Sequence, residues 1–195
     1  MTARRATEAD RDAVATMLAR AFQDDPATSY ILPDPADRAR RLPRLFRLLY
    51  ESDGGGMRLV TPGGEAATLW RAPGNADVST WEIVRRAPAL LRALGGGVGR
   101  ALRVSDAIAA HHPAGEYWYL HIAGCDPAAQ GRGLGGAAVR AGLAHIPPRF
   151  PAYLETATER NLGFYRGLGF EVVDEWHVPK GGPRFWSMMR PAARE

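Results

Sequence analysis

The segment Gln130-Gly131-Arg132-Gly133-Leu134-Gly135-Gly136 has the composition of a loop that can hold an anionic group. Glycines leave backbone amides free to turn towards an anion, and the alanine-rich run that follows predicts a helix whose N-terminus adds its dipole. Arg132 would add a charged contact. The pattern indicates a phosphate-binding turn, although the same residues also suit a plain tight turn before a helix.

The spacing Gly131-x-Gly133-x-x-Gly136 also matches the fingerprint of dinucleotide-binding folds, with Glu155 downstream at a distance that suits a ribose contact. In those folds the first glycine directly follows a strand. Here residues 125–130 intervene, and the roughly 60 residues that remain are too few for a doubly wound half and a substrate domain. An NAD(P)-dependent oxidoreductase is therefore the weaker alternative.

Three polar residues follow the glycine segment at spacings that could serve catalysis. Asn161 and Tyr165 are four residues apart, so a helix would put both on one face. Glu155 stands near the end of a predicted strand, 152–156, where open sheets bind ligands. Each residue alone also suits a structural role, as a packing tyrosine or an ion-paired glutamate. Their combination favours a catalytic phenol beside a phosphorylated cofactor.

Alternating strand and helix patterns indicate a mixed α/β (α+β) fold that positions these residues. Strands are predicted at 3–7, 57–61, 66–72, 117–123, 152–156, 171–178 and 184–189. Helices are predicted from Asp10 to the Asp24-Asp25-Pro26 break, from Asp34-Pro35 through the apolar positions of 42–49, from the Ser79-x-x-Glu82 capping box to 94, at 100–110, after the glycine segment, and around Asn161 and Tyr165.

The strand at 117–123 is apolar on both faces. Trp118, Leu120 and Ile122 alternate with Tyr117, Tyr119 and His121, which predicts a strand covered on both sides. Core packing is expected for Trp118 and Tyr119, and also for Trp81. The alternative is that these rings line a pocket for a planar ligand.

The helix after the capping box has Trp81, Val84, Leu91 and Leu94 at helical spacing. Residues 95–99, which contain four glycines, form a predicted flexible joint to the next helix. The two helices could form a lid over a substrate or a plain helical hairpin packed on the sheet, and the sequence favours neither.

The composition is that of an ordinary globular protein of 195 residues, with 46% hydrophobic and 24% charged residues. The length suits one domain, 1–195, and the net charge of +4 suits an anionic small ligand without demanding nucleic acid. Residues 1–10 show no signal peptide, and no apolar run is long enough to cross a bilayer. We therefore expect a cytoplasmic protein with no membrane or nucleic-acid partner.

Cysteine and histidine usage argues against a metal site. Cys125, the one cysteine, cannot form an intrachain disulfide or a cysteine-based zinc cluster. His111, His112 and His121 lack a metal-ligand pattern. The sequence positions no histidine or aspartate to activate Cys125, so a covalent route through its thiol is not expected.

Together these residues resemble the GNAT superfamily of N-acetyltransferases. Gln130 to Gly135 matches its Gln-x-x-Gly-x-Gly motif for the pyrophosphate of acetyl-CoA, and Arg160-Asn161-x-x-Phe164-Tyr165-x-x-Leu168-Gly169-Phe170 matches its late helix. The resemblance is closer still to puromycin N-acetyltransferase-like members, in which Leu154-Glu155-Thr156 and Gly182-Pro183-Arg184 recur in the same order. It covers most of the chain and is poorest over Trp70–Pro113.

The resemblance implies a GNAT fold, a central mixed and mostly antiparallel sheet of about seven strands that is flanked by helices. The sheet would be splayed between the fourth and fifth strands, Tyr117–Cys125 and Ala152–Thr156. It also implies acetyl-CoA as co-substrate and no metal. The residues implied to hold the cofactor are Ile122, Ala123, Gly124 and Cys125 for the pantetheine arm, Gln130, Gly131, Arg132, Gly133, Leu134, Gly135 and Gly136 for the pyrophosphate, and Asn161 to orient the arm.

The implied reaction is direct transfer of an acetyl group to a primary amine of a small molecule through a tetrahedral intermediate. An aminonucleoside-type antibiotic is one candidate acceptor, which would make the protein an antibiotic-resistance enzyme. Glu155 is the expected base, directly or through water, because alkyl amines are mostly protonated at pH 7. Tyr165 is expected to hydrogen-bond the leaving thiolate. A non-catalytic acetyl-CoA sensor is the alternative, and a monomer and a homodimer are both compatible with the sequence.

Overall fold

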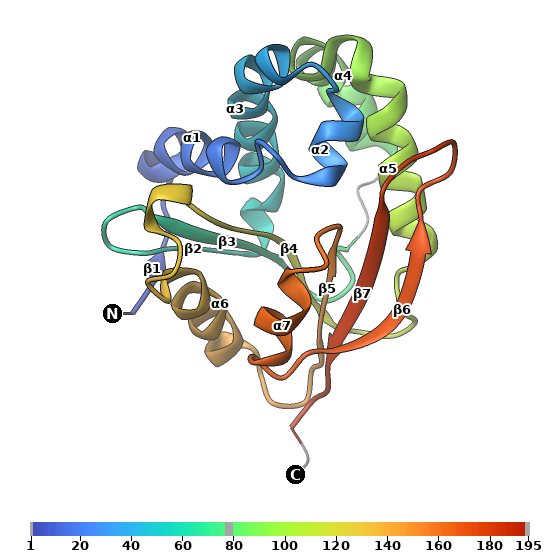
Figure 1. Cartoon of the computed structure of the whole chain (residues 1–195). Helices are drawn as coiled ribbons and strands as arrows, with labels where there is room; N and C mark the ends of the chain where they lie inside the picture. Colours follow the sequence, from blue (N-terminus) through green and yellow to red (C-terminus); the bar gives the residue numbers. More distant parts are fainter. Residues whose placement is uncertain (1, 77–79, 194–195) are drawn as a thin grey trace.

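The computed structural model describes residues 2–76 and 80–193, and within them seven strands form one sheet with helices on both faces (Figure 1). The strand order is β1-β2-β3-β4-β5-β7-β6. The strands are β1 (Arg4–Arg5), β2 (Met57–Val60), β3 (Ala66–Arg71), β4 (Trp118–Cys125), β5 (Ala152–Thr156), β6 (Glu171–His177) and β7 (Arg184–Arg190). All neighbours are antiparallel except β4 and β5, which confirms the predicted mixed, mostly antiparallel sheet.

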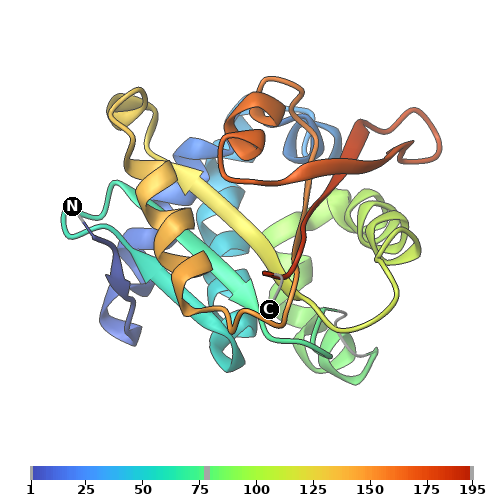
Figure 2. The same cartoon turned by 90° about the horizontal axis from the view of Figure 1, so that it is seen from below.

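Helices cover the two faces of the sheet unequally (Figures 1 and 2). One face carries α1 (Arg11–Ala21), α2 (Pro26–Ile31), α3 (Pro35–Ser52), α4 (Thr80–Leu94) and α5 (Val98–Ala110), and the other carries α6 (Leu134–His145) and α7 (Asn161–Arg166). Two apolar cores result: one joins α1 to α5 with β2 and β3, and the other joins α6 and α7 with β2 to β5.

Aspartates begin two of the helices on the first face. The Asp34 carboxylate accepts the amide hydrogen of Asp37 at the start of α3, and Pro35 follows it, as the sequence predicts. The break predicted at residues 24–26 ends α1, but the short helix α2 that follows was not foreseen. Asp25 caps α2, because its Oδ1 accepts from the amides of Ala27 and Thr28 at 2.9 and 3.1 Å.

A β-bulge at His121 interrupts the alternation along β4. Leu69 of β3 pairs with Ile122 and Trp70 pairs with Leu120, which leaves His121 as the extra residue. Leu120 consequently packs in the core beneath α6, whereas Ile122 packs against the core beneath α1. The prediction that these two side chains share a face is therefore wrong, since a bulge shifts the alternation by one residue.

The parallel ladder between β4 and β5 is very short. It consists of the pairs Trp118–Ala152 and Tyr119–Tyr153. Beyond them the two strands part, as Figure 2 shows for the yellow β4 and the orange β5. Because a bulge bends its strand, His121 accounts for the separation directly after the second pair. The predicted splay between the fourth and fifth strands is confirmed.

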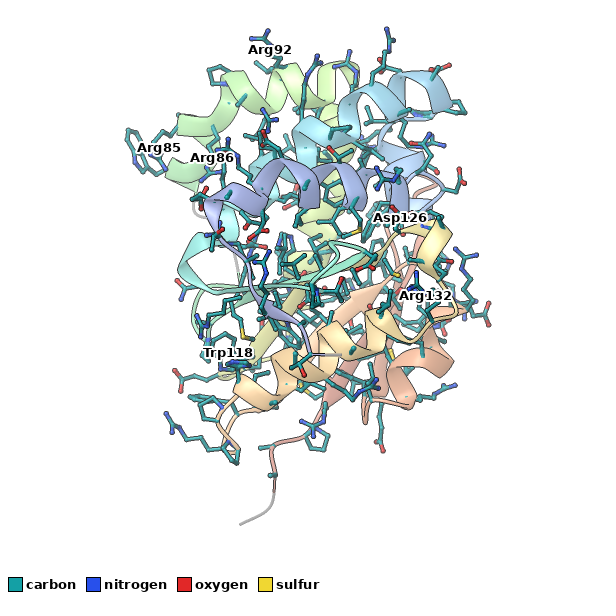
Figure 3. The ribbon with its side chains drawn as sticks, turned by 90° about the vertical axis from the view of Figure 1, so that its left-hand side faces the viewer. Arg85, Arg86, Arg92, Trp118, Asp126 and Arg132 are labelled. Atoms are coloured by element: carbon teal, nitrogen blue, oxygen red, sulfur yellow. The ribbon has the colours of Figure 1, made fainter. Side chains whose placement is uncertain are left out.

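The outer face of α4 differs from the expectation. Trp81, Val84 and Leu91 are 73%, 58% and 57% exposed, so core packing of Trp81 is wrong, whereas Leu94 is buried as its spacing suggests. Ser79 of the predicted capping box lies outside the described residues. Figure 3 shows Arg85, Arg86 and Arg92 along this helix, well separated from Asp126 and Arg132.

The inner faces of α4 and α5 pack on α2 and α3, which agrees with the helical-hairpin interpretation. Arg86 donates to the Leu48 carbonyl of α3, and a Cβ at Gly97 would lie 2.7 Å from the Ile31 carbonyl of α2. The glycine joint thus allows a close approach of backbones. In the described part of the chain, no helix combines the length and apolarity needed to span a membrane.

Candidate functional site

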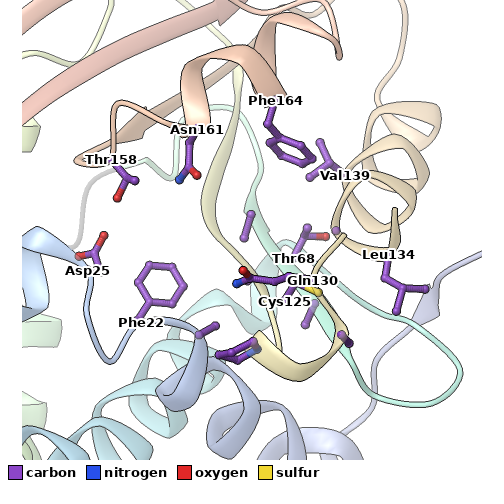
Figure 4. Close-up of a pocket in the computed structure, with 18 of the residues that line it drawn as sticks. Phe22, Asp25, Thr68, Cys125, Gln130, Leu134, Val139, Thr158, Asn161 and Phe164 are labelled. Atoms are coloured by element: carbon purple, nitrogen blue, oxygen red, sulfur yellow. The ribbon is translucent and has the colours of Figure 1, made fainter. Parts of the chain in front are cut away.

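A crevice of about 690 Å³ opens between the end of α1, the start of β3, the end of β4, the start of α6, and α7 (Figure 4). Of the predicted site residues, those that line it are Ala123, Gly124, Cys125, Gln130, Gly131, Gly133, Leu134, Gly135, Gly136, Asn161 and Tyr165. Ile122, Arg132 and Glu155 do not line it. The glycine segment, the end of β4 and the late helix therefore meet around one space.

The glycine turn has the geometry of an anion-binding site. Gly131 and Gly133 have φ of +78° and +74°, a left-handed conformation that glycine adopts without strain. Gly133 caps α6, and the Ala137 amide makes the first helical bond, to the Gly133 carbonyl at 2.9 Å. The preceding amides of α6 have no carbonyl within the helix to accept them, and apart from that of Gly135, which faces the Cys125 thiol, they are available to a phosphate in the crevice.

One edge of β4 faces the gap towards β5. On its other edge β4 is paired with β3, from Arg71–Tyr119 to Ala66–Cys125. Beyond Tyr119, β4 and β5 form no pair in the described residues, so those amides and carbonyls of 122–125 that do not point towards β3 face the parted side. An extended amide-bearing chain such as pantetheine fits such an edge. Gly124 also seats α1, because a Cβ there would lie 2.5 Å from Leu18.

The Tyr165 phenol is buried at the crevice wall. Its ring packs against Phe164 and Phe170, with centroids 5.0 and 6.0 Å away. Burial, and then the charge of Asp25, raise the pKa of Tyr165 well above its ordinary value. The phenol is therefore protonated at neutral pH and can donate a hydrogen bond. On the same helix, Asn161 donates to Thr156 at 3.2 Å, which ties α7 to the end of β5.

Asp25 is a crevice residue that the sequence analysis treated only as a helix terminator. Burial raises the pKa of its carboxyl, opposed by the amides of Thr28 and Ala27 and by the Thr158 hydroxyl. Figure 4 shows the Asp25 carboxylate pointing towards Thr158, which lies beside Asn161. An aspartate before a proline is typical of a helix cap. This local pattern does not indicate that the cap of α2 lies in the crevice lining.

Charged side chains line the mouth of the crevice. Arg20 of α1 donates to the Asp126 carboxylate from Nε at 3.0 Å, and this bond holds the pKa of Asp126 below its ordinary value. Arg160 also lines the crevice, and its charge acts on Asp25. Arg132 is exposed and does not line the crevice, and its contact with a ligand stays a prediction. The arginines in the crevice lining are thus Arg20 and Arg160.

Glu155 lies in a separate buried cluster between β4 and β5. Its side chain is 3% exposed, and Oε1 lies 3.3 Å from Nε2 of His112. Burial, followed by the Glu155 charge, raises the pKa values of Tyr119 and Tyr153. Tyr153 also bonds Ser187 Oγ at 2.8 Å. His112 was not predicted in this cluster, because the loop before β4 shows no periodic pattern.

A second carboxylate–histidine pair lies at the bulge of β4. Nδ1 of His121 is 2.6 Å from Oδ2 of Asp53, and Arg71 donates from Nε to Oδ1 of Asp53 at 2.7 Å. Burial would raise the pKa of Asp53, but His121 and Arg71 outweigh it and hold the pKa below the ordinary value. The sequence gives no signal for this trio, since folding of the sheet brings together residues up to 68 positions apart.

The Cys125 thiol is partly buried, and burial raises its pKa, opposed by the Gly135 amide. A thiol that is protonated at neutral pH is a poor nucleophile, which agrees with the expectation that no covalent route runs through it. Within residues 2–76 and 80–193, no group of three or more His, Cys, Asp or Glu side chains has the arrangement of a metal site.

Comparisons with known proteins give a consistent picture. No family model matches the chain. Among solved structures, it resembles the "histone acetyltransferase HPA2 and related acetyltransferase" of Corynebacterium glutamicum, with a TM-score of 0.75, 27% identity, and coverage of 100% of this chain and 97% of that one. Arylalkylamine N-acetyltransferase 2 of Aedes aegypti is similar at a TM-score of 0.58 and 13% identity, over 97% and 98% of the two chains.

In sequence, the chain is 39% identical over 74 residues to a mycothiol acetyltransferase of a Nocardioides strain, over 36% of this chain and 25% of that protein. The chain thus spans about a quarter of the length of the curated relatives that it matches. The fold is that of the GNAT acetyltransferases, and the named relatives and structural neighbours are acetyltransferases.

Proposed function

We propose that the chain is an acetyl-CoA-dependent N-acetyltransferase that acetylates a primary amine of a small molecule. The observation that supports this best is the gap where β4 and β5 part, next to a crevice lined by a left-handed glycine turn and a buried phenol. When bound, acetyl-CoA supplies an acetyl group activated as a thioester.

Binding of the coenzyme would rest on backbone groups. The amides from Gly131 to Gly136 hold the pyrophosphate, and Arg20 and Arg160 add positive charge at the mouth. The free edge of β4 at 122–125 bonds the pantetheine arm as an added strand, and Asn161 orients that arm. The amides near Gly124 and Cys125 would stabilise negative charge on the carbonyl oxygen.

Two crevice side chains have complementary acid–base properties. Tyr165, protonated at neutral pH, donates a hydrogen bond to the departing sulfur. Asp25 lines the crevice, and its ionised carboxylate would attract a protonated acceptor amine. Burial, and then the Asp25 charge, raise the pKa of Tyr165. A cationic small molecule is therefore the acceptor class that this charge distribution favours.

The acceptor amine must lose a proton. Glu155, which the sequence suggests as the base, is buried beside His112. It would therefore take the amine proton through a neighbouring side chain or a water molecule rather than by direct contact with the amine. A primary amine on an aminonucleoside or an arylalkylamine fits the proposal. The carboxylates of Asp24 and Asp25 in the lining would also suit agmatine, whose ammonium and guanidinium groups are both cationic.

Two measurements test the proposal. Coenzyme A at about 100 times its dissociation constant should add about 2.7 kcal/mol to the free energy of unfolding, and NADP should add none. Thiol release from acetyl-CoA should then depend on an added amine, tested with puromycin, tyramine and agmatine. Stabilisation without thiol release would favour a sensor, and stabilisation by NADP alone would favour the oxidoreductase.

A further inference from the structure

A second hollow continues the crevice along the groove between α6 and α7, which lie next to each other on one face of the sheet (Figure 1). In the crevice, α6 contributes Gly136 and Val139, and α7 contributes Phe164. The second hollow, of about 420 Å³, takes its lining from the next turn of α6, the end of α7 and the end of β7: Arg140, Leu143, Ala144, Gly167, Leu168 and Arg190. A ligand that leaves the crevice between the two helices therefore enters the second hollow.

Two arginines provide the charge of the second hollow. Over residues 2–76 and 80–193, neither Arg140 nor Arg190 forms an ion pair or a side-chain hydrogen bond, and no carboxylate lines the hollow. Arg20 in the crevice lining differs from both, because it donates to Asp126. Guanidinium groups bind phosphate through parallel hydrogen bonds, so a phosphate group is the ligand that this pair of arginines suits.

The Arg140 guanidinium lies at the boundary between the two spaces. The side chain folds back along α6, so that a Cβ at Gly136 would lie 3.2 Å from its Nη1 and 3.3 Å from its Nη2. Gly136 itself lines the crevice, and it stands three residues, about 5 Å along the helix, beyond Gly133. On the opposite wall, Nε of Arg190 lies 3.3 Å from the position of a Cβ at Gly169. One cation is thus close to the glycine turn, and a second lies across the hollow.

Coenzyme A carries a phosphate monoester on the 3′-oxygen of its ribose, in addition to the pyrophosphate on the 5′-oxygen. If the pyrophosphate binds the first amides of α6, a single ribose separates it from the monoester, which can then reach Arg140. The ring of Phe164 is 41% exposed beside this path, and Figure 4 shows it directed towards Val139. An exposed aromatic ring gives a nucleotide base a surface on which to stack.

We propose that the second hollow binds the ribose 3′-phosphate of coenzyme A, with Arg140 as the main contact and Arg190 as the second. This inference rests on the proposed use of acetyl-CoA and adds to it a means of distinguishing the coenzyme from its dephospho form. The monoester carries a charge of about −1.5 to −2 at pH 7, which the two guanidinium groups balance.

The first test compares two forms of the coenzyme by isothermal titration. The wild type should bind coenzyme A about 10-fold or more tightly than dephospho-coenzyme A, the scale of one hydrogen bond to a charged group. Arg140→Gln should lower the affinity for coenzyme A to near that for the dephospho form, and it should leave the affinity for the dephospho form unchanged. Arg190→Gln should reduce the preference in the same way but to a smaller extent.

Arg166→Gln is the matched control. Arg166 is an exposed arginine at the end of α7 that lines neither the crevice nor the second hollow. Its loss removes the same charge and should leave the preference for coenzyme A as in the wild type. Equal losses of preference in Arg166→Gln and Arg140→Gln would show that only the overall positive charge matters, which would overturn the assignment.

A second test follows the monoester itself by ³¹P spectroscopy. In the free coenzyme this group titrates with a second pKa near 6. Guanidinium groups favour the dianion, so binding to the wild type should lower this pKa, and binding to Arg140→Gln should leave it closer to the free value. A wild-type complex in which the monoester titrates as in free coenzyme would contradict the proposal.

The outcomes separate this inference from the proposed function. If neither form of the coenzyme binds, the proposed function fails and takes the inference with it. If both forms bind equally and the wild type still releases thiol with an amine, only the inference fails. Inorganic phosphate identifies the remaining source: if it binds the wild type but not Arg140→Gln, while the two forms of the coenzyme bind equally, the second hollow serves a separate phosphorylated molecule and the assignment to the coenzyme is wrong.

Discussion

The Tyr165 phenol and the Asp25 carboxylate come from distant parts of the sequence and lie close enough at the crevice for one charge to shift the other's pKa. A buried tyrosine beside a carboxylate holds its proton more tightly than a solvated one. Tyr165 can therefore assist a leaving group by donating a hydrogen bond, while complete transfer of its proton is energetically uphill.

Tyr165→Phe removes that donor and keeps the ring. Its packing against Phe164 and Phe170 should survive, so the coenzyme should bind as before, while kcat falls by 10-fold or more, on the order of a general-acid contribution. Thiol release under saturating coenzyme measures the effect. Wild-type turnover in this variant would contradict the role given to Tyr165.

Asp25→Asn separates charge from structure. An asparagine can still cap α2, so the melting temperature should stay near that of the wild type. Loss of the negative charge should raise KM for a cationic amine by about 10-fold or more, the scale of one charged hydrogen bond. Asp34→Asn, at the matching cap of α3 outside the crevice lining, should leave KM unchanged. Equal effects of the two variants would mean that Asp25 acts only as a cap.

At the scale of single residues, the sequence predicted what is local. The glycine turn, Asn161 and Tyr165 occupy short motifs, and all of them reach the crevice. Asp25 and the Asp53–His121 pair were missed because their roles depend on partners far away in the chain. Glu155 was singled out for its position at a strand end, but the direction in which its side chain points depends on the pairing of β5 with β7, where it lies opposite Ser187.

Among the elements, the turn before α6 joins backbone conformation to ligand binding. Gly133→Ala would force a side chain into the left-handed region, at a cost of about 1–2 kcal/mol. If the first turn of α6 relieves this strain by moving its amides out of the binding geometry, the same free energy is lost from binding. The affinity for coenzyme A should then fall by about 10-fold. Isothermal titration measures it.

Gly99→Ala is the control for that substitution. Gly99 lies in α5 with nothing near its missing Cβ, and its backbone is not left-handed. Alanine should stabilise this helix by up to about 1 kcal/mol and leave coenzyme affinity unchanged. A similar loss of affinity in both variants would contradict a specific role for the turn.

Element types were predictable because seven strands and most helices carry a clear period or cap. The bulge in β4 was not, because both faces of that strand are apolar and an inserted residue leaves no mark in such a pattern. Burial of Trp81 on α4 was wrongly predicted for a related reason. Apolar residues at helical spacing indicate a helix, but they do not show which face of that helix the rest of the chain covers.

Across the whole molecule, paired carboxylates should control the response of stability to acid. The pKa of Asp10 is held well below its ordinary value, first by Arg4, whose guanidinium donates to both carboxylate oxygens at 2.7 and 2.8 Å. His121 and Arg71 lower that of Asp53, and Arg20 that of Asp126. Each lowered pKa contributes to the free energy of unfolding at pH values above those at which carboxyls of the unfolded chain titrate. This contribution is lost as the pH falls through the pKa of the group in the folded protein.

The free energy of unfolding should therefore fall steadily below about pH 4, where the unfolded chain binds more protons than the folded one. Asp25 has the opposite sign, because its raised pKa lets it regain stability as it is protonated. Urea titrations at several pH values measure the slope. Asp10→Asn should lower stability at pH 7 and make the acid slope shallower, and an unchanged slope would contradict the assignment to Asp10.

In the described residues, β1–β4 are joined to β5–β7 along the sheet by two residue pairs between β4 and β5 and by the bond from the Trp118 amide to the Pro151 carbonyl. A chain cut between α6 and β5, at residues 146–151, would divide the protein at this seam into two fragments. Each fragment would keep its own strands paired, while the glycine turn and Tyr165 would fall on different pieces. A coenzyme that contacts both fragments would favour their association, so that the reassembled fraction would report the concentration of the coenzyme.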